Sequence, residues 1–255
     1  MRYRPENRIE CKKLSQILSD IDEEIDCAFF EVKDKDLEKI MKSTGEYYGK
    51  IGPEYDEIWY SNRARKQYRT VYSFLQREIA QRLAKEELVL DAGCGTCEWG
   101  VFMVGNGATV VGLNQSSMML KAGKEKSRSQ RLMRSLSLVR GDVSLLPFGE
   151  GTFDGATVQF VLSHLPDDEL RLLLSGLERV VKKKGWMVFA DTRLHEPHRQ
   201  QEHVVRTLKS GKEYVIYKRY FAAEGLKTLL EQRLSRPFFA SELDRWVICS
   251  TMLSA

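Results

Sequence analysis

An acidic residue followed by two closely spaced glycines forms the segment best suited to hold a ligand. The apolar residues 88–90 lead into Asp91, and Gly93 and Gly95 follow before a predicted helix over residues 98–105. Glycine lets the backbone turn tightly and lets a ligand approach it closely. Ligands of open α/β sheets bind beyond the carboxyl ends of the strands. We therefore expect a binding pocket at this turn.

Two classes of cofactor compete for such a loop. A dinucleotide would require a third glycine where this chain has Glu98, and its pyrophosphate would meet the like charges of Asp91 and Glu98. S-adenosyl-L-methionine carries no phosphate, and its sulfonium and ammonium groups are positively charged. The acidic loop is therefore compatible with S-adenosyl-L-methionine, and a tight turn without a ligand is the alternative.

Polar residues stand at the ends of the next predicted strands. The second strand ends at Asn114, about 20 residues beyond the glycines, where a ribose-binding side chain belongs. The third ends at Asp142, whose carboxylate can accept a hydrogen bond from an adenine amino group. The fourth contains Gln159, and His164 follows it. These ends should meet at one edge of the sheet.

Strands alternating with helices must position these residues, and this alternation is typical of a parallel sheet. After a break over residues 193–211, a strand, a helix and two closely paired strands are predicted. The fold class is therefore α/β, a doubly wound, mostly parallel seven-stranded sheet with an antiparallel edge hairpin. The predicted strands are 88–91, 109–114, 138–142, 155–160, 186–191 and 214–218, with two more near 238 and over 246–252, and the predicted helices are 98–105, 117–127, 168–181 and 223–232.

Two segments precede this domain, which should span residues 86–255. Residues 1–45 are predicted to be a helical extension, because apolar residues recur at helical spacing from Leu14 to Ile25 and a short second helix starts near Leu37. Its apolar face would need a partner surface, so a homodimer through this extension is one hypothesis. Residues 46–85 are predicted to be a cap made of an aromatic-rich loop over 47–56 and a long helix over 71–83.

Composition narrows the class of protein. The 255 residues carry 40 basic and 36 acidic side chains, and this net charge of +4 is too small by itself to indicate nucleic-acid binding. The longest apolar runs fall short of the roughly 18 residues of a membrane span, and the N-terminus lacks the apolar core of a secretory signal, so we expect a cytoplasmic protein. We expect no metal, since neither the Cys94–Cys97 pair nor His195 and His198 have enough further ligands nearby.

With these motifs in place, the chain resembles class I S-adenosylmethionine-dependent methyltransferases, the broad group that includes ubiquinone and menaquinone C-methylating enzymes and many small-molecule methyltransferases. The resemblance covers about residues 46–192. It rests on four segments, which are Asp91-Ala92-Gly93-Cys94-Gly95, Leu146-Pro147-Phe148 with Phe153-Asp154, Leu162-Ser163-His164-Leu165, and Arg179 to Gly185.

The resemblance implies a set of cofactor contacts. The methionine moiety would lie against the glycine turn and the end of the fourth strand, and the adenosine against the ends of the second and third. One position departs from the family, since Asn114 stands where Asp or Glu is usual, although its amide can both accept and donate. The implied cofactor-binding residues are Asp91, Gly93, Gly95, Asn114, Gln115, Asp142, Val143 and Gln159.

Methyl transfer is an in-line displacement, and orientation alone supplies about 7–11 kcal/mol. A general base is needed only when the acceptor loses a proton. His164 is the candidate catalytic base, against the alternative of a structural histidine. Candidate substrate-binding residues are Tyr48, Tyr55, Arg193 and Tyr217, each with ordinary packing or ion pairing as its alternative.

Three functions follow in order of preference. The first is a methyltransferase acting on a small molecule, because aromatic residues in the cap favour an enclosed pocket. The second is an RNA or protein methyltransferase, for which basic residues over 63–69 and 121–134 would bind phosphate, although such runs are usually solvated surface. The third is a non-catalytic scaffold that binds the cofactor.

Overall fold

The computed structural model describes residues 36–196 and 198–252. Most of the predicted N-terminal extension, residues 1–35, lies outside the described residues. Within the described part, no helix has the length and apolar character needed to cross a membrane.

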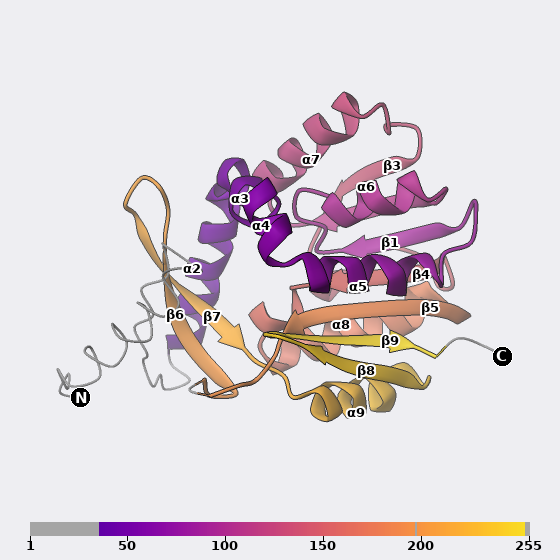
Figure 1. The fold of residues 1–255 in the computed structure, drawn as a ribbon. Coiled ribbons are helices and arrows are strands. Elements are labelled where there is room, and N and C mark those ends of the chain that lie inside the picture. The colour runs from indigo at the N-terminus through magenta and orange to yellow at the C-terminus, as the bar shows by residue number, and fades with distance from the viewer. Residues whose placement is uncertain (1–35, 197, 253–255) are drawn as a thin grey trace.

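A seven-stranded sheet forms the centre of the molecule and confirms the predicted fold class (Figure 1). Five strands run parallel, and the hairpin of the last two adds an antiparallel edge. The strand order is β3-β2-β1-β4-β5-β9-β8. The strands are β1 (Leu88–Ala92), β2 (Thr109–Asn114), β3 (Leu136–Arg140), β4 (Phe153–Gln159), β5 (Val181–Thr192), β8 (Phe238–Leu243) and β9 (Trp246–Thr251).

Helices cover both faces of this sheet because successive strand residues point to opposite sides. Val89 packs with α5 (Arg69–Ala80) and α6 (Glu98–Gly105). The next residue, Leu90, packs on the other face with α8 (Asp167–Val180) and α9 (Ala223–Leu234). Strands buried on both faces read as continuous apolar runs, which is why these strands were recognisable in the sequence.

A cap covers the carboxyl edge of the sheet, at the left of Figure 1. It consists of α2 (Leu37–Lys50), α3 (Gly52–Trp59) and α4 (Asn62–Gln67). The helix α7 (Ser117–Ser129) follows β2 and contacts α2 and α3 of the cap. The predicted loop over 47–56 is wrong, because Tyr47 and Ile51 are buried in a small apolar cluster that favours helix through this segment.

A two-stranded sheet lies beside the cap and was not predicted. We call it the flap, and it consists of β6 (Gln201–Thr207) and β7 (Glu213–Arg219). Only β7 was expected, and the break over 193–211 is wrong. The covered face of β6 carries Glu202 and Arg206 around Val204, so the apolar alternation that identifies a strand is missing from the sequence.

The third strand is also displaced, to residues 136–140 instead of 138–142. Asp142 ends it early, because its side chain accepts a hydrogen bond from the amide of Ser144 and begins a short 3-10 turn over Val143–Leu145. Local capping by a short acidic side chain thus competes with strand pairing.

Candidate active site

The glycine turn between β1 and α6 has a backbone that only glycine adopts readily. Gly93 has φ +75° and Gly95 has φ +52°, both in the left-handed region. A β-carbon on Gly93 would lie 2.3 Å from Cγ2 of Val161, so a side chain has no room there. The amides of Gly93 and Cys94 both donate to the carbonyl of Leu113, which ties the turn to β2.

Asp91 lies beneath this turn and is 1 % exposed. Its Oδ1 accepts a hydrogen bond from the Thr157 hydroxyl at 3.1 Å, and its Oδ2 faces the backbone of Gly100 in α6. Burial raises the pKa of this carboxyl to about 7. The floor of the turn therefore carries a group that becomes an anion more readily when a cation lies near it.

The ends of β2 and β3 bring the predicted adenosine-binding residues together. The amide of Gly141 donates to the carbonyl of Asn114 at 3.1 Å, and Asp142 follows directly, with Val143 next in the turn. The Asn114 side-chain oxygen accepts from the amide of Ser116 at 2.8 Å, which leaves the Asn114 amide nitrogen as its outward donor. The carbonyl of Gln115 accepts from Arg140.

Gln159 ends β4, and one of the two polar atoms of its side-chain amide forms a hydrogen bond. Its Nε2 donates to the carbonyl of Val188 at 3.1 Å, whereas its buried Oε1 has no hydrogen-bond partner among the described residues. The next residue, Phe160, has φ 59°, a costly conformation for a bulky side chain. This sharp bend brings Val161 against Gly93.

The cap is bound to the glycine turn by charged and polar contacts. Lys126 of α7 lies within 2.8 Å of Asp56 and 2.9 Å of Glu98, and it donates to the Thr96 hydroxyl at 3.2 Å. The Thr96 hydroxyl also donates to Asp56. Tyr55 lies over the turn, since a β-carbon on Gly95 would be 3.9 Å from its ring. We call this group of contacts the latch.

Tyr48 and His164 form a buried hydrogen-bonded pair at the junction of cap and sheet. His164 Nδ1 lies 3.0 Å from the carbonyl of Tyr217, so Nδ1 carries the proton. Nε2 is then an acceptor, and the Tyr48 hydroxyl donates to it at 2.8 Å. Burial holds the pKa of His164 well below its usual value and raises the pKa of Tyr48, so both side chains are neutral near pH 7.

The remaining two candidate substrate-binding residues lie in different places. The Tyr217 hydroxyl accepts from Arg219 at 3.0 Å, and its backbone carbonyl meets His164. Arg193 pairs with Glu242 of the edge hairpin at 3.0 Å and does not join the Tyr48–His164 pair. Asp191, two residues earlier, does not pair with Arg193 but accepts hydrogen bonds from backbone amides. The roles of Tyr217 and Arg193 stay predictions.

Two residues of this site were missed by the sequence analysis. Lys218 is buried on β7, and its ammonium donates to the hydroxyl of Ser163 at 2.8 Å. Lys126 was placed in a solvated basic run, yet its side chain is 14 % exposed and belongs to the latch. An alternating pattern at 214–221 was the only signal for Lys218.

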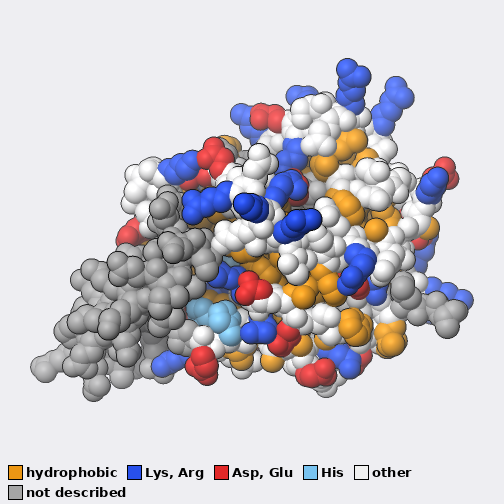
Figure 2. All heavy atoms as spheres, in the orientation of Figure 1, with side chains coloured by type: hydrophobic (Ala, Val, Ile, Leu, Met, Phe, Trp, Pro, Cys, Tyr) orange, Lys and Arg blue, Asp and Glu red, His pale blue; other side chains and the backbone are white. Residues whose placement is uncertain are grey.

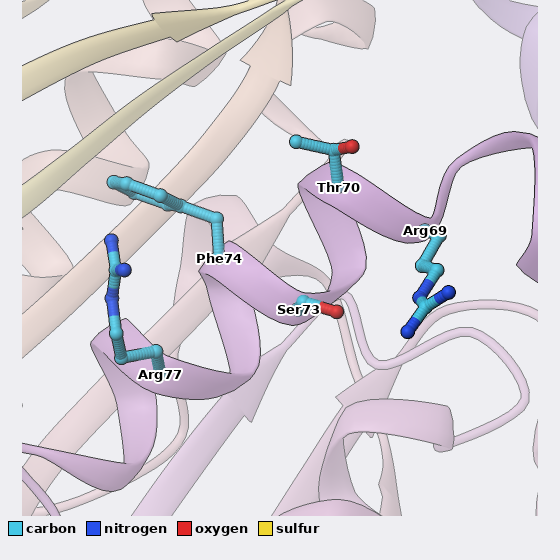
Figure 3. A pocket seen from close by; sticks show the side chains of 5 residues that line it. All are labelled: Arg69, Thr70, Ser73, Phe74 and Arg77. Carbon is cyan, nitrogen blue, oxygen red and sulfur yellow. The ribbon is translucent and has the colours of Figure 1, made fainter.

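Other surface features lie outside this edge. Figure 3 shows a shallow hollow lined by side chains of one helix, α5, with the Arg77 guanidinium 4.6 Å from the Phe74 ring centre. Basic side chains gather over α4 and over the top of the molecule, where α7 lies, with acidic side chains beside them (Figure 2). Neither feature brings together groups suited to bond making.

Comparison with known proteins agrees with this geometry. A family model described as "Methyltransferase domain" matches residues 89–185. Demethylmenaquinone methyltransferase of Staphylococcus carnosus is 35 % identical over 132 residues, which are 48 % of this chain and 53 % of that protein. The enzyme of the same name from Listeria welshimeri is 31 % identical over 172 residues, 64 % of each chain. The chain thus spans between half and two thirds of the length of these curated relatives.

Solved structures share the fold over more of the chain. A DhpI–SAH complex superposes with a TM-score of 0.68 at 20 % identity, covering 84 % of this chain and 96 % of the other. A 1,6-didemethyltoxoflavin-N1-methyltransferase of Burkholderia thailandensis gives a TM-score of 0.67 at 15 % identity, covering 91 % and 96 %. Residues 89–185 therefore match the methyltransferase domain family, and the described residues share the fold of these solved structures.

Proposed function

We propose that this chain transfers a methyl group from S-adenosylmethionine to a small-molecule acceptor. The observation that carries the proposal is the capped glycine turn. A turn with two left-handed glycines lies at the carboxyl edge of the sheet, and the latch holds α3 over it. An RNA or protein acceptor would need a more open groove, and a scaffold would not need closure.

The residues around the turn fit the proposed cofactor. Gly93 and Gly95 add no side chains of their own to the turn, between Val161 and Tyr55, and the Asp91 carboxyl beneath them favours a cationic group. The buried Oε1 of Gln159 lacks a donor, which an ammonium group would supply. Asn114 and Asp142, with Gln115 and Val143, would hold the ribose and adenine. When bound, the cofactor supplies an activated methyl group.

The chain's own residues would orient the acceptor and receive its proton. Tyr55 and Tyr48 come from the cap, so the acceptor would lie between them and the turn. The Tyr217 side chain lies on the other face of the flap, and its backbone carbonyl would contribute by holding His164. His164 cannot be a free base in this geometry, because its Nε2 already accepts the Tyr48 hydroxyl. We infer that Tyr48 takes a proton from the acceptor while passing its own to His164, which makes His164 the final base.

Cofactor binding is tested by calorimetry with S-adenosylhomocysteine and S-adenosylmethionine. Asp142→Asn should weaken binding at least tenfold, since a hydrogen bond to a charged group contributes about 1.5–3 kcal/mol. Asp168→Asn is the matched control, because Asp168 is exposed in the first turn of α8. Absence of heat with both nucleosides for the unaltered protein would contradict the proposal.

Catalysis is tested by release of S-adenosylhomocysteine from S-adenosylmethionine in the presence of small acceptors. Tyr48→Phe and His164→Gln should each lower kcat while cofactor affinity stays within twofold. A cytoplasmic location and a homodimer through residues 1–45 are further proposals, and cell fractionation and light scattering of the whole chain test them. A protein that binds both nucleosides but turns over no acceptor would favour the scaffold.

A further inference from the structure

Two basic side chains share the covered face of the flap. In its antiparallel register, Lys218 lies opposite Glu202, Ile216 opposite Val204, and Tyr214 opposite Arg206. Directly opposed residues share a face of the sheet, and so do alternate residues along a strand. Val204 and Ile216 are buried against the cap, so Lys218 and Arg206 lie on the side of the flap turned toward the cap.

Lys218 reaches from the flap to the carboxyl ends of β4 and β5. Its ammonium donates to the Ser163 hydroxyl at 2.8 Å, and the Ser163 amide donates to Asp191 at the end of β5. The side chain is 8 % exposed, and burial lowers the pKa of its ammonium to about 8. A buried cation of this kind requires compensation by an anion.

The charge of Arg206 affects side chains around Lys218. Burial is the main cause of the lowered pKa values of His164 and Lys218, and the positive charge of Arg206 adds to both shifts. Its charge also lowers the pKa of Tyr48, against the larger increase that burial causes. The guanidinium therefore lies near all three side chains, beside the predicted acceptor position.

The charges of Asp191 and Glu202 partly offset the effect of burial on the pKa of Lys218, but both carboxylates hydrogen-bond to other groups, and Oε2 of Glu202 is buried without a hydrogen-bond partner among the described residues. Asp191 accepts from the amides of Ser163 and Thr192, and Oε1 of Glu202 accepts from the Tyr220 hydroxyl and lies 2.9 Å from His198. Within residues 36–196 and 198–252, neither Lys218 nor Arg206 forms an ion pair of 4.0 Å or less with a carboxylate. Both cations are therefore available to an incoming anion.

The distance from this place to the cofactor turn suits a small molecule. Val161 packs against Gly93, and Ser163 and His164 follow two and three residues later. Consecutive Cα atoms are 3.80 Å apart, so at most about 11 Å of chain separates the two places. An acceptor of one ring with a substituent spans such a distance.

We propose that Lys218 and Arg206 bind an oxyanion, a carboxylate or phosphate ester, on the methyl acceptor and thereby select acidic small molecules. The proposal rests on the methyltransferase function proposed above. The Ser163 hydroxyl would donate to the same oxyanion, and Tyr48 would face the nucleophile. An uncharged acceptor would leave buried Lys218 and half-buried Arg206 without an ion pair.

The test measures binding of size-matched probes to the whole chain saturated with S-adenosylhomocysteine. Benzoate and phenyl phosphate carry the oxyanion, and benzamide is the uncharged counterpart of benzoate. We expect calorimetry to show binding of at least one anion, and affinity for benzamide at least tenfold weaker than for benzoate if benzoate is the one bound. The stronger anion identifies the acceptor's group.

Variants assign the effect to the two cations. Lys218→Met and Arg206→Met should each weaken anion binding at least tenfold while S-adenosylhomocysteine affinity stays within twofold, and Lys218→Arg should keep most of the anion affinity. Lys183→Met, at an exposed lysine of β5, is the control of equal charge change. Unchanged nucleoside binding shows that a variant is folded.

The outcomes distinguish a failure of the oxyanion site from a failure of the proposed methyltransferase function. Loss of nucleoside binding in the unaltered protein would overturn the proposed methyltransferase function. Normal nucleoside binding with equal affinity for benzoate and benzamide and no binding of phenyl phosphate would overturn only the oxyanion site. Anion binding that survives both methionine substitutions would also overturn it.

Discussion

Gly93→Ala tests the geometry of the cofactor turn with a single methyl group. A left-handed backbone costs a residue with a β-carbon about 1–2 kcal/mol. The added carbon would also lie 2.3 Å from Cγ2 of Val161, and such overpacking costs about 1–3 kcal/mol. We therefore expect the free energy of unfolding to fall by about 2–5 kcal/mol, and affinity for S-adenosylhomocysteine to fall with it.

A double-variant cycle separates the two costs. Val161→Ala removes the atom that the new methyl group meets, so the pair should recover the overpacking part, a coupling of about 1–3 kcal/mol. Only the backbone strain at position 93 should remain. Gly105→Ala is the control, because nothing lies within 4 Å of its added carbon.

Urea unfolding of the four proteins in the cycle gives the coupling energy directly. The reasoning would be refuted if the two substitutions were additive to within about 0.5 kcal/mol. It would be refuted equally if Gly93→Ala unfolded at the same urea concentration as the unaltered chain. Calorimetry on the same samples then relates the shape of the turn to cofactor affinity.

Three further predictions concern charge and hydrogen bonding. Burial raises the pKa of Asp91 to about 7, so the folded state binds this proton more tightly than the unfolded state does. The free energy of unfolding should therefore fall by up to about 4 kcal/mol as the pH rises from about 4 to 7. Urea unfolding at several pH values should show this decline for the unaltered chain and not for Asp91→Asn. Lys126→Met removes the cation that Asp56 and Glu98 share, although Glu98 keeps its ion pair with Arg65, and it should weaken S-adenosylhomocysteine binding about 5- to 100-fold. Lys124→Met, at an exposed position of α7, should not change the titration. Tyr48→Phe removes the donor to neutral His164, so stability should fall by about 1–3 kcal/mol and the pKa of His164, followed by NMR titration, should rise; an unmoved histidine resonance would contradict the assigned hydrogen bond.

The cofactor half of the molecule was predictable because its signals are local. A strand buried on both faces, two glycines and a helix over 98–105 follow one another without interruption, and the structure reproduces each of them. Gly93 is recognisable in the sequence because its left-handed backbone conformation itself requires glycine. The third strand was displaced because its end depends on a side-chain hydrogen bond from Asp142, which periodicity does not reveal.

The proposed acceptor side was less predictable because its contacts join distant segments. Lys218 meets Ser163 across 55 positions, and Tyr48 meets His164 across 116. Polar residues on the covered face also hide β6, since a strand that faces a site lacks the apolar alternation of one that faces a core. The folding of Tyr47 into α2 likewise depends on burial against the flap.

The flap enters and leaves the molecule at one point. Arg193 and Phe221 form a bridge, and the amide of Leu194 donates to the carbonyl of Phe221 at 2.9 Å. These two ends are already held together, so a replacement segment of similar length would close its loop at nearly the same entropic cost. Chimeras that replace residues 195–220 alone should therefore leave the glycine turn and the sheet intact, so this segment can be exchanged as one unit to alter the proposed acceptor preference.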